Sequence, residues 1–324
     1  MTVDNIAGEA VARVRERVTV SEVGPRDGLQ IERAMVTTDD KVQLIEALAD
    51  AGLTRIEAGA FVNPKVVPQM ADSREVLARV RRRPNLRFGA FVPNVKGAEL
   101  AIAAGAKDLK AGIAASDSFN ELNVRMSTEA GVAVMANINA VAKAADDVQI
   151  LGVVATAFGC PYEGPVSRDR IYRLFGQLVK FGCPVIYLAD TTGMAIPHQI
   201  SELVDDLRRR WPAQAIGLHL HNTRGLGLAN ALTGLQAGVR DFESSIGGLG
   251  GCPFAPRAVG NISTEDFVHM ASGMGFDCRL DLDRLIHAAI IAQDMLGRTL
   301  PGMVMKAGPA SVRFEKGEPS VKLD

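Results

Sequence analysis

Two histidines stand close together in the segment GLHLHNTRG, residues 217–225, where a short apolar run ends. If residues 216–221 form a β-strand, the alternation of side chains along it places His219 and His221 on one face. Two imidazoles that point the same way could bind a metal ion, or they could be half-buried histidines held by their neighbours. The segment alone leaves both readings open, so the rest of the chain must decide.

Two further residues could complete a metal site. Asp27, in the segment GPRDGLQ (24–30), could add a carboxylate oxygen, and Asn261 could add a neutral amide oxygen. Nitrogen and oxygen ligands without a thiolate favour Mg²⁺ or Mn²⁺ over a closed structural zinc site, although imidazoles also tolerate zinc. The alternative is that Asp27 and Asn261 are ordinary loop residues, since both types are common in turns.

Charged and polar neighbours suggest what such a site could do. Arg26, beside Asp27, would place a fixed cation where negative charge could develop on a carbonyl oxygen. Glu57 could hold that guanidinium in position, and a purely structural Arg–Glu pair is compatible with this role. Gln30 could donate a hydrogen bond to a substrate or cap the turn that follows.

Cysteine occurs four times, without CxxC spacing, which predicts free thiols in a reducing cytoplasm. Three of the four stand in Gly-Cys-Pro, at Cys160, Cys183 and Cys252. Cys183 precedes a predicted strand and is expected to be structural. Cys252 lies in the glycine-rich segment GGLGGCP, which could fold over a bound ligand. A buried, inert thiol is the alternative for any isolated cysteine.

The composition of the 324-residue chain is that of an ordinary globular protein, with 47% hydrophobic residues. Lys plus Arg (36) nearly balance Asp plus Glu (37), so no net field attracts nucleic acid or a membrane surface. The N-terminus has no apolar core of a signal peptide, and no apolar run is long enough to span a bilayer. We therefore expect a cytoplasmic protein whose partners are small molecules or copies of itself.

Apolar, β-branched segments alternate with helical patterns from end to end, which predicts a single repeated β/α unit. The first connecting helix is marked by a capping pair, Thr37 and Asp40, and by Gly52 at its end. Eight strands are predicted: Val18–Val23, Arg55–Ala58, Arg87–Phe91, Asp108–Ile113, Gln149–Ala155, Val185–Ala189, Ile216–His221 and Asp241–Ser245.

Eight β/α units predict a (β/α)8 TIM barrel, with a doubly wound sheet as the alternative. The active site of such a barrel lies where the strands end, and the polar residues named above do stand at the ends of predicted strands or directly after them. We expect residues 1–276 to form the catalytic barrel. Residues 277–324 should form a C-terminal helix and tail that pack on the barrel or on a partner subunit.

Several motifs together resemble the 3-hydroxy-3-methylglutaryl-CoA lyase family (hydroxymethylglutaryl-CoA lyases), in the metal-dependent barrel superfamily that includes isopropylmalate synthase. The resemblance runs from about residue 18 to beyond residue 300. It is carried by EVGPRDGLQ, FVNPKVVPQMAD, GCPYEG, HLHNTRG and the cysteine loop GLGGCPFAP. The first and fourth motifs are shared across the superfamily, whereas the cysteine loop is specific to the lyases.

The resemblance implies a retro-Claisen cleavage of a CoA thioester, as in leucine catabolism, by a homo-oligomeric enzyme. For the parent substrate the products would be acetyl-CoA and acetoacetate. The implied metal ligands are Asp27, His219, His221 and Asn261, with Mg²⁺ or Mn²⁺ as the cofactor. The resemblance further implies that Arg26 faces the enolate, that Cys252 protonates it, and that His219 or Asp27 is the base.

Four positions depart from the family pattern, namely Asn222, Leu151, Ala60 and Arg257. Leu151 stands where the family usually has arginine, and Arg257 where it has a small or neutral residue. Both could meet the acyl group, so Arg257 is also a candidate substrate-binding residue. A lyase for a related thioester such as citramalyl-CoA, a synthase running in the condensing direction, and a non-enzymatic metal-binding barrel are the rival readings.

Overall fold

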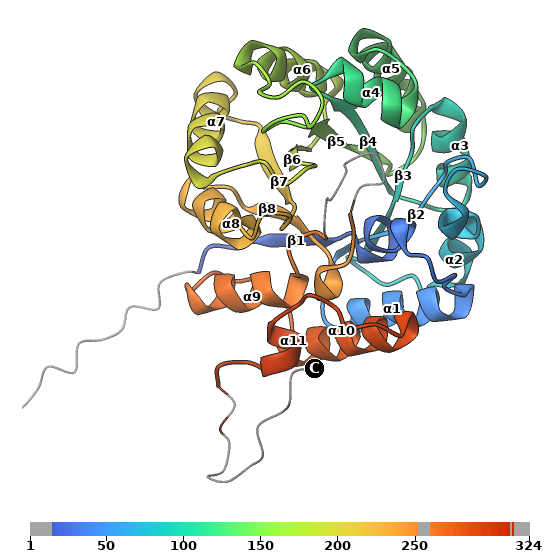
Figure 1. The fold of residues 1–324 in the computed structure, drawn as a ribbon. Helices are drawn as coiled ribbons and strands as arrows, with labels where there is room; N and C mark the ends of the chain where they lie inside the picture. Colours follow the sequence, from blue (N-terminus) through green and yellow to red (C-terminus); the bar gives the residue numbers. More distant parts are fainter. Residues whose placement is uncertain (1–14, 252–259, 312, 314–324) are drawn as a thin grey trace, which may run out of the picture.

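Eight parallel strands close into one barrel in chain order, with helices around the outside (Figure 1). The computed structural model describes residues 15–251, 260–311 and 313. The predicted (β/α)8 barrel is therefore confirmed, and the doubly wound sheet is excluded. The strands are β1 (Thr19–Glu22), β2 (Arg55–Ala60), β3 (Arg87–Phe91), β4 (Asp108–Ala114), β5 (Gln149–Ala155), β6 (Val185–Asp190), β7 (Ala215–Leu220) and β8 (Asp241–Ser244).

The connecting segments are mostly helices. The α-helices are α1 (Thr38–Asp50), α2 (Ser73–Arg79), α3 (Val95–Ala103), α4 (Asp117–Val124), α5 (Thr128–Ala144), α6 (Arg168–Phe181), α7 (Pro197–Arg210), α8 (Gly227–Gln236), α9 (Thr264–Gly273), α10 (Leu282–Leu296) and α11 (Val304–Ala307). Four short helical turns are η1 (Gly24–Gly28), η2 (Leu29–Ile31), η3 (Pro68–Met70) and η4 (Ile246–Gly248).

The first helix forms as its sequence signals predicted. The Thr37 side chain accepts a hydrogen bond from the Asp40 amide, so it satisfies one of the unpaired donors at the helix start. Gly52 follows the end of α1 with a φ of +99°, a conformation that favours glycine. A Cβ at this position would lie 2.8 Å from the backbone oxygen of Arg279, so this glycine also permits close approach of the segment before α10.

The seventh strand ends one residue earlier than predicted. β7 stops at Leu220, and His221 instead forms an isolated antiparallel bridge with Asn261. This bridge brings the segment that precedes α9 against the end of β7. The predicted bounds of β3 and β5 match those observed, and β1, β2, β4, β6 and β8 differ by one or two residues at their ends.

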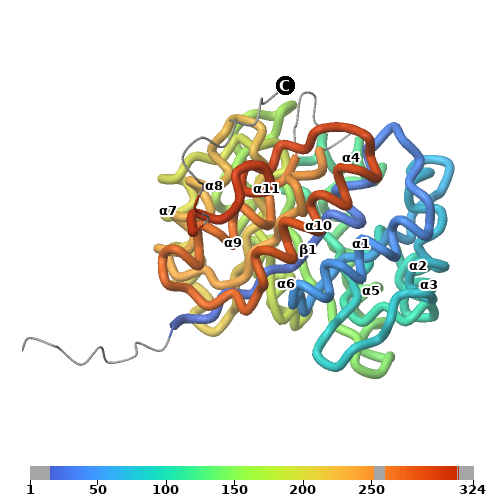
Figure 2. Tube along the Cα trace, turned by 90° about the horizontal axis from the view of Figure 1, so that it is seen from below, coloured from blue at the N-terminus to red at the C-terminus, as the bar shows by residue number. Residues whose placement is uncertain are grey.

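The last long helix packs on the outside of the barrel. α10 contacts α1 and α9, so the first helix of the barrel and the last long helix lie side by side (Figures 1 and 2). Leu285, Ala288, Ala289 and Ala292 form the buried face of α10. Residues 312 and 314–324 of the predicted tail lie outside the described residues.

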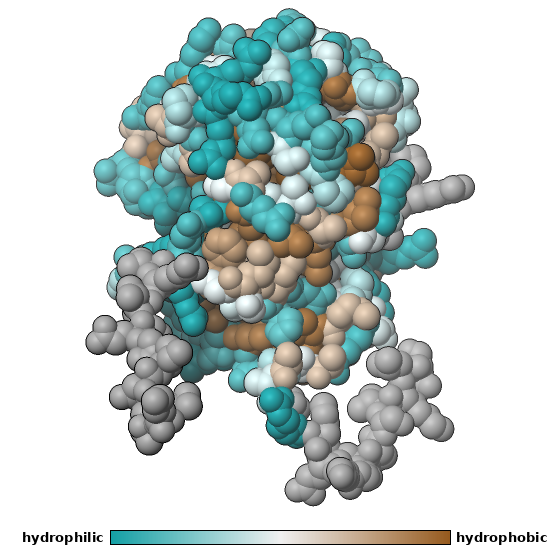
Figure 3. Space-filling view, turned by 90° about the vertical axis from the view of Figure 1, so that its left-hand side faces the viewer, coloured by the Kyte–Doolittle hydropathy of each residue, from teal (hydrophilic) through white to brown (hydrophobic). Residues whose placement is uncertain are grey.

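On the face that Figure 3 displays, polar residues cover much of the surface, and apolar residues gather in a band across it. None of the helices within the described residues is long and apolar enough to cross a membrane.

Candidate metal centre and active site

The first part of the site is the π-helical turn η1, which follows β1. The backbone amides of residues 26–28 all donate hydrogen bonds to the carbonyl oxygen of Val23, at 3.1, 2.7 and 3.2 Å. A Cβ at Gly28 would lie 2.8 Å from the Cβ of Leu249, so glycine at this position lets the segment after β8 approach the turn. Turns of this wide type are frequent at functional sites, and this one carries Asp27 and its neighbour Arg26.

The two histidines lie at the end of β7 and face each other. The Nε2 atoms of His219 and His221 are 3.1 Å apart. Leu218 and Leu220, which alternate with them, are fully buried in the hydrophobic core. The predicted alternation is therefore confirmed, because both imidazoles turn toward one site while the leucines pack into the core.

Asp27 and Asn261 complete this cluster. One ligand atom from each of Asp27, His219 and His221 lies within 4.8 Å of the others. Nδ2 of Asn261 donates to Oδ2 of Asp27 at 2.8 Å. Oδ1 of Asn261 is buried and, among the residues that the structure describes, has no hydrogen-bond partner. A buried oxygen left without a donor beside a carboxylate and two imidazoles fits a divalent cation of the N/O-binding kind.

Electrostatics favour the metal-binding forms of these side chains. Burial by itself would raise the pKa of Asp27, but the positive charge of Arg26, followed by the two histidines, lowers it to about 2. Burial, and then repulsion from His221, lower the pKa of His219 well below its ordinary value. Near neutral pH the first group is thus a carboxylate and the second a neutral imidazole, as metal binding requires.

Arg26 is held on three sides at the edge of this cluster. Its Nη1 donates to Oδ1 of Asp27 at 2.8 Å, and its Nε donates to Oε1 of Glu57 at 2.5 Å. The guanidinium also lies over the ring of Phe91, 4.8 Å from the ring centroid. Glu57 therefore does hold Arg26, as the sequence indicated, and the cation is fixed directly beside a candidate metal ligand.

Two further polar residues near the cluster, Gln30 and Asp190, form hydrogen bonds within the protein. Nε2 of Gln30 donates to Oδ1 of Asp27 at 2.8 Å, so its amide positions this carboxylate. Asp190, the last residue of β6, accepts hydrogen bonds from the amides of Met194 and Ala195. It therefore holds the turn after β6, because its Oδ1 is aimed at that backbone.

Sequence reasoning missed two charged residues that lie behind the cluster. Oε2 of Glu243, on β8, is 2.9 Å from Nδ1 of His219. Lys110, on β4, forms ion pairs with Glu243 and with Glu57. Lys110 stands inside a strand that is otherwise mostly apolar, and a charge at such a position is the signal that could have identified it, whereas β8, with the sequence DFES, offers no such contrast for Glu243.

Three of the four cysteines lie within the described residues. Cys160, Cys183 and Cys278 are free and buried. Burial raises the pKa of Cys183 to about 11, in agreement with its predicted structural role. Cys252 and Arg257, the predicted proton donor and acyl-group contact, lie outside the described residues.

The other three departures from the family pattern occupy separate places. Leu151 is buried inside the barrel, next to Lys110 in the register of β4 and β5. Ala60 is buried at the end of β2. Asn222 is exposed, and its side chain accepts a hydrogen bond from the amide of Gly227. None of the three replaces a residue of the candidate ligand set.

A (β/α)8 barrel with an N/O ligand cluster and a fixed arginine where its strands end defines a class of metal-dependent barrel enzymes. Residues 17–291 match the model of the HMGL-like family. The chain belongs to the HMGL-like family, and it is a carbon–carbon lyase.

Two curated relatives illustrate the relationship. The (R)-citramalyl-CoA lyase of Chloroflexus aurantiacus is 43% identical over 304 residues, covering 91% of this chain and 96% of the relative. The mitochondrial hydroxymethylglutaryl-CoA lyase of Rattus norvegicus is 41% identical over 292 residues, covering 90% of each chain.

Solved structures give the same picture. An HMG-CoA lyase of Acinetobacter baumannii, in complex with coenzyme A and 3-methylmalate, is 42% identical with a TM-score of 0.88. That alignment covers 92% of this chain and 97% of the other. The hydroxymethylglutaryl-CoA lyase of Pseudomonas aeruginosa is 35% identical with a TM-score of 0.87, covering 90% and 97%. The predicted family resemblance is thus confirmed over nearly the whole chain.

Proposed function

We propose that the protein cleaves 3-hydroxy-3-methylglutaryl-CoA to acetyl-CoA and acetoacetate, with citramalyl-CoA as the second candidate substrate. The single observation that carries this proposal is the contact between Arg26 and Asp27 at 2.8 Å, which joins a fixed cation to the candidate metal centre. A retro-Claisen cleavage needs both elements side by side, one at the hydroxyl group and one at the thioester carbonyl. The citramalyl-CoA alternative rests on the similarity to the Chloroflexus enzyme.

The residues proposed to hold the metal ion are Asp27, His219, His221 and Asn261. Their oxygen and nitrogen donors suit Mg²⁺ or Mn²⁺. When bound, such an ion lowers the pKa of a hydroxyl group that it contacts.

Two residues of the cluster are proposed as the acceptor of the hydroxyl proton, Asp27 and His219. Asp27 is already engaged by hydrogen bonds from Arg26, Gln30 and Asn261, and its low pKa makes it a weak base. His219 has Nδ1 against Glu243, which would stabilise an imidazolium, but it can take up the proton only at Nε2 and only while Nε2 does not bind the metal ion. Asp27→Asn separates the two roles, because it keeps an oxygen ligand while removing the basic group.

As the carbon–carbon bond breaks, its electron pair moves onto the thioester carbonyl oxygen and forms the enolate of acetyl-CoA. Arg26 would stabilise that charge, and it needs no rearrangement to do so because Glu57 and Phe91 already hold it. Cys252 is the proposed donor of the proton that the enolate carbon takes up. Arg257, in the same loop, is proposed to contact the acyl group.

The proposal includes a homo-oligomer that acts on CoA thioesters in the cytoplasm, with a role in leucine breakdown. The band of apolar residues in Figure 3 supports self-association, since contiguous exposed apolar surface often marks a protein interface.

The test is a screen of the purified protein with Mg²⁺ or Mn²⁺ against CoA thioesters of tertiary hydroxy acids. We expect release of acetyl-CoA, with 3-hydroxy-3-methylglutaryl-CoA or citramalyl-CoA as the best substrate. Product analysis after mixing acetyl-CoA with a keto acid tests the condensing alternative. The lyase proposal is wrong if the protein forms thioesters from these compounds but cleaves none.

A further inference from the structure

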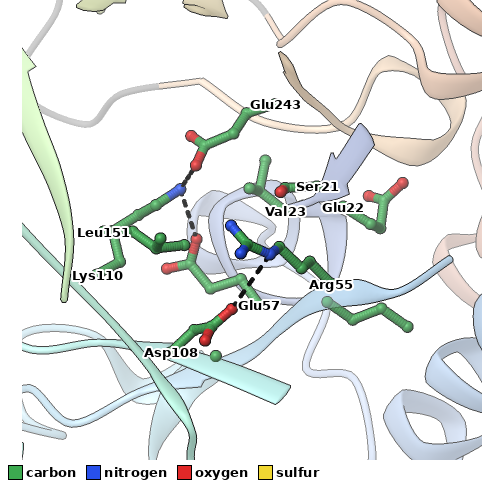
Figure 4. Close-up of a pocket in the computed structure, with 11 residues that line it drawn as sticks. Ser21, Glu22, Val23, Arg55, Glu57, Asp108, Lys110, Leu151 and Glu243 are labelled. Carbon is green, nitrogen blue, oxygen red and sulfur yellow. Dashed lines mark hydrogen bonds and ion pairs between the residues drawn. The ribbon is translucent and has the colours of Figure 1, made fainter. Parts of the chain in front are cut away.

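Lys110 lies in the interior of the barrel with its ammonium group between two carboxylates. Nζ is 3.3 Å from Oε2 of Glu57 and also pairs with Oε1 of Glu243 (Figure 4). Its side chain is 7% exposed, and the two glutamates are even more buried. A lysine buried to this extent is rare unless it is paired with an acid. Its position between two glutamates therefore suggests a specific function.

Each of these carboxylates uses its second oxygen to hold a residue of the active site. Oε1 of Glu57 accepts from Nε of Arg26, and Oε2 of Glu243 contacts Nδ1 of His219. The ammonium group of Lys110 is therefore the central link of an unbroken chain of contacts between a candidate metal ligand and the cation proposed to face the enolate.

Two other cations lie near Lys110, and each pairs with a carboxylate. Nε of Arg26 donates to Oε1 of Glu57, and Nε of Arg55, which lines the same pocket as Lys110, lies 3.7 Å from Oδ2 of Asp108 (Figure 4). Leu151, the neighbour of Lys110 on β5, is apolar. Oε2 of Glu57 is buried and makes no hydrogen bond in the described structure, so the ion pair with the ammonium group, 3.3 Å away, is what offsets its negative charge.

We propose that Lys110 is a positioning residue for the cleavage reaction, which sets the placement of Arg26 and His219 together by holding Glu57 and Glu243. This inference rests on the proposed function for its kinetic consequence, but not for its effect on metal binding. If the link is lost, the two carboxylates repel each other, and both the guanidinium and the imidazole lose their fixed support.

The register between β4 and β5 provides a way to move the charge instead of deleting it. Lys110 and Leu151 are paired positions, and both line the same pocket. In Lys110→Met/Leu151→Arg, the guanidinium can reach the two carboxylates from the adjacent strand. In Leu151→Arg alone, a second cation would stand beside the existing ammonium group.

The experiment compares Lys110→Met, Lys110→Arg, Leu151→Arg and the double variant with the wild type. Lys107→Met is the matched control, because it removes a half-exposed lysine that directly precedes β4. Mn²⁺ affinity is measured by titration, and kcat and KM are measured with the best thioester. Circular dichroism and thermal unfolding report on folding of each variant.

We expect Lys110→Met to weaken Mn²⁺ binding and to lower kcat, each about 10- to 100-fold, as loss of supporting contacts around a metal site commonly does. KM should change less than kcat. Lys110→Arg should lose less, because it keeps the charge. Introduced alone, Leu151→Arg should lower Mn²⁺ affinity and kcat, whereas in the Lys110→Met background it should restore both. A merely structural lysine would not produce this reversal in the effect of Leu151→Arg.

Unchanged Mn²⁺ affinity and kcat in folded Lys110→Met would overturn the inference. If that variant does not fold, the double variant decides, since a folded protein without recovered Mn²⁺ affinity would also overturn it. If the wild type cleaves no thioester, the proposed function fails, whereas the Mn²⁺ titrations still determine whether Lys110 supports His219.

Discussion

His219 on β7 and Glu243 on β8 are paired neighbours in the barrel, with Nδ1 of the histidine 2.9 Å from Oε2 of the glutamate. A histidine that binds a metal ion through Nε2 commonly donates its Nδ1–H to a carboxylate, which fixes the tautomer and the ring orientation. Glu243 is in the correct place for this role. The register of β7 and β8 thus determines which carboxylate faces Nδ1 of His219.

Glu243→Gln should therefore weaken metal binding. The amide removes the negative charge behind His219, and we expect Mn²⁺ affinity to fall about 10- to 100-fold. Glu202→Gln is a matched control, because Glu202 also pairs with a histidine, His198, but on the exposed surface. Equal Mn²⁺ affinities for both variants and the wild type would show that Glu243 does not support the ligand.

Removal of the metal ion should abolish turnover. The cluster of Asp27, His219 and His221, with the unpaired oxygen of Asn261, supports a divalent cation as the cofactor. We expect no acetyl-CoA release after treatment with a chelator and dialysis, and recovery on addition of Mg²⁺ or Mn²⁺. Full activity in protein shown to be metal-free by elemental analysis would rule out the proposed mechanism.

Cys252 and Cys183 should respond in opposite ways to substitution. If Cys252 protonates the enolate, Cys252→Ala should lower kcat about 10²- to 10⁴-fold with metal content unchanged. Cys183→Ala should leave kcat nearly unchanged, since its buried thiol lies on the outside of β5 near Gly152. Wild-type kcat in Cys252→Ala, with chemistry limiting the rate, would show that another group is the acid.

Alkylation should also distinguish Cys252 from the buried cysteines. The pKa values of Cys183 and Cys278 are raised to about 11 by burial, so few thiolates form at pH 8. We expect Cys252 to react first and bound substrate to protect it, as measured by mass spectrometry of peptides. Faster labelling of Cys183 or Cys278 would contradict the proposed accessibility of the loop thiol.

Arg257→Gly should change substrate preference more than metal affinity. This position departs from the family pattern by size and charge, and the loop that contains it carries the proposed proton donor. We expect the order of kcat/KM among CoA thioesters with different acyl groups to change, while the Mn²⁺ affinity stays within about threefold of the wild type. An unaltered order would place the acyl pocket elsewhere.

Glu22 should make the protein less stable as the pH rises. Burial is the main reason that its pKa is raised from 4.5 to about 7, despite hydrogen bonds from Thr264, Ile246 and Gly24. The folded state then binds more protons than the unfolded state between these pH values, so the free energy of unfolding falls as the pH rises through this window. The full effect corresponds to about 3 kcal/mol.

Glu22→Gln should flatten this dependence, because glutamine does not titrate. Thermal unfolding from pH 5 to pH 8 measures the difference, with exposed Glu99→Gln on α3 as the control. The same downward slope in Glu22→Gln as in the wild type would assign the effect to other groups, such as Glu265, whose pKa burial also raises to about 7.

Local features of the structure could be predicted because their causes are local. The cap at Thr37, the turn at Gly52 and the common face of His219 and His221 depend on residues within a few positions of one another. The number of strands follows from hydrophobic patterning, and eight of them in alternation with helices favoured a closed barrel.

The sequence by itself therefore determined the elements, the barrel class and the candidate ligands. Only the tertiary structure decided how distant residues meet, because such contacts depend on barrel closure and strand register. Asn261 reaches Asp27 across 234 positions of sequence, through the bridge that starts where β7 ends. Lys110 meets Glu243 across 133 positions, since β4 and β8 both turn these side chains into the barrel interior, and no local pattern indicates that pairing.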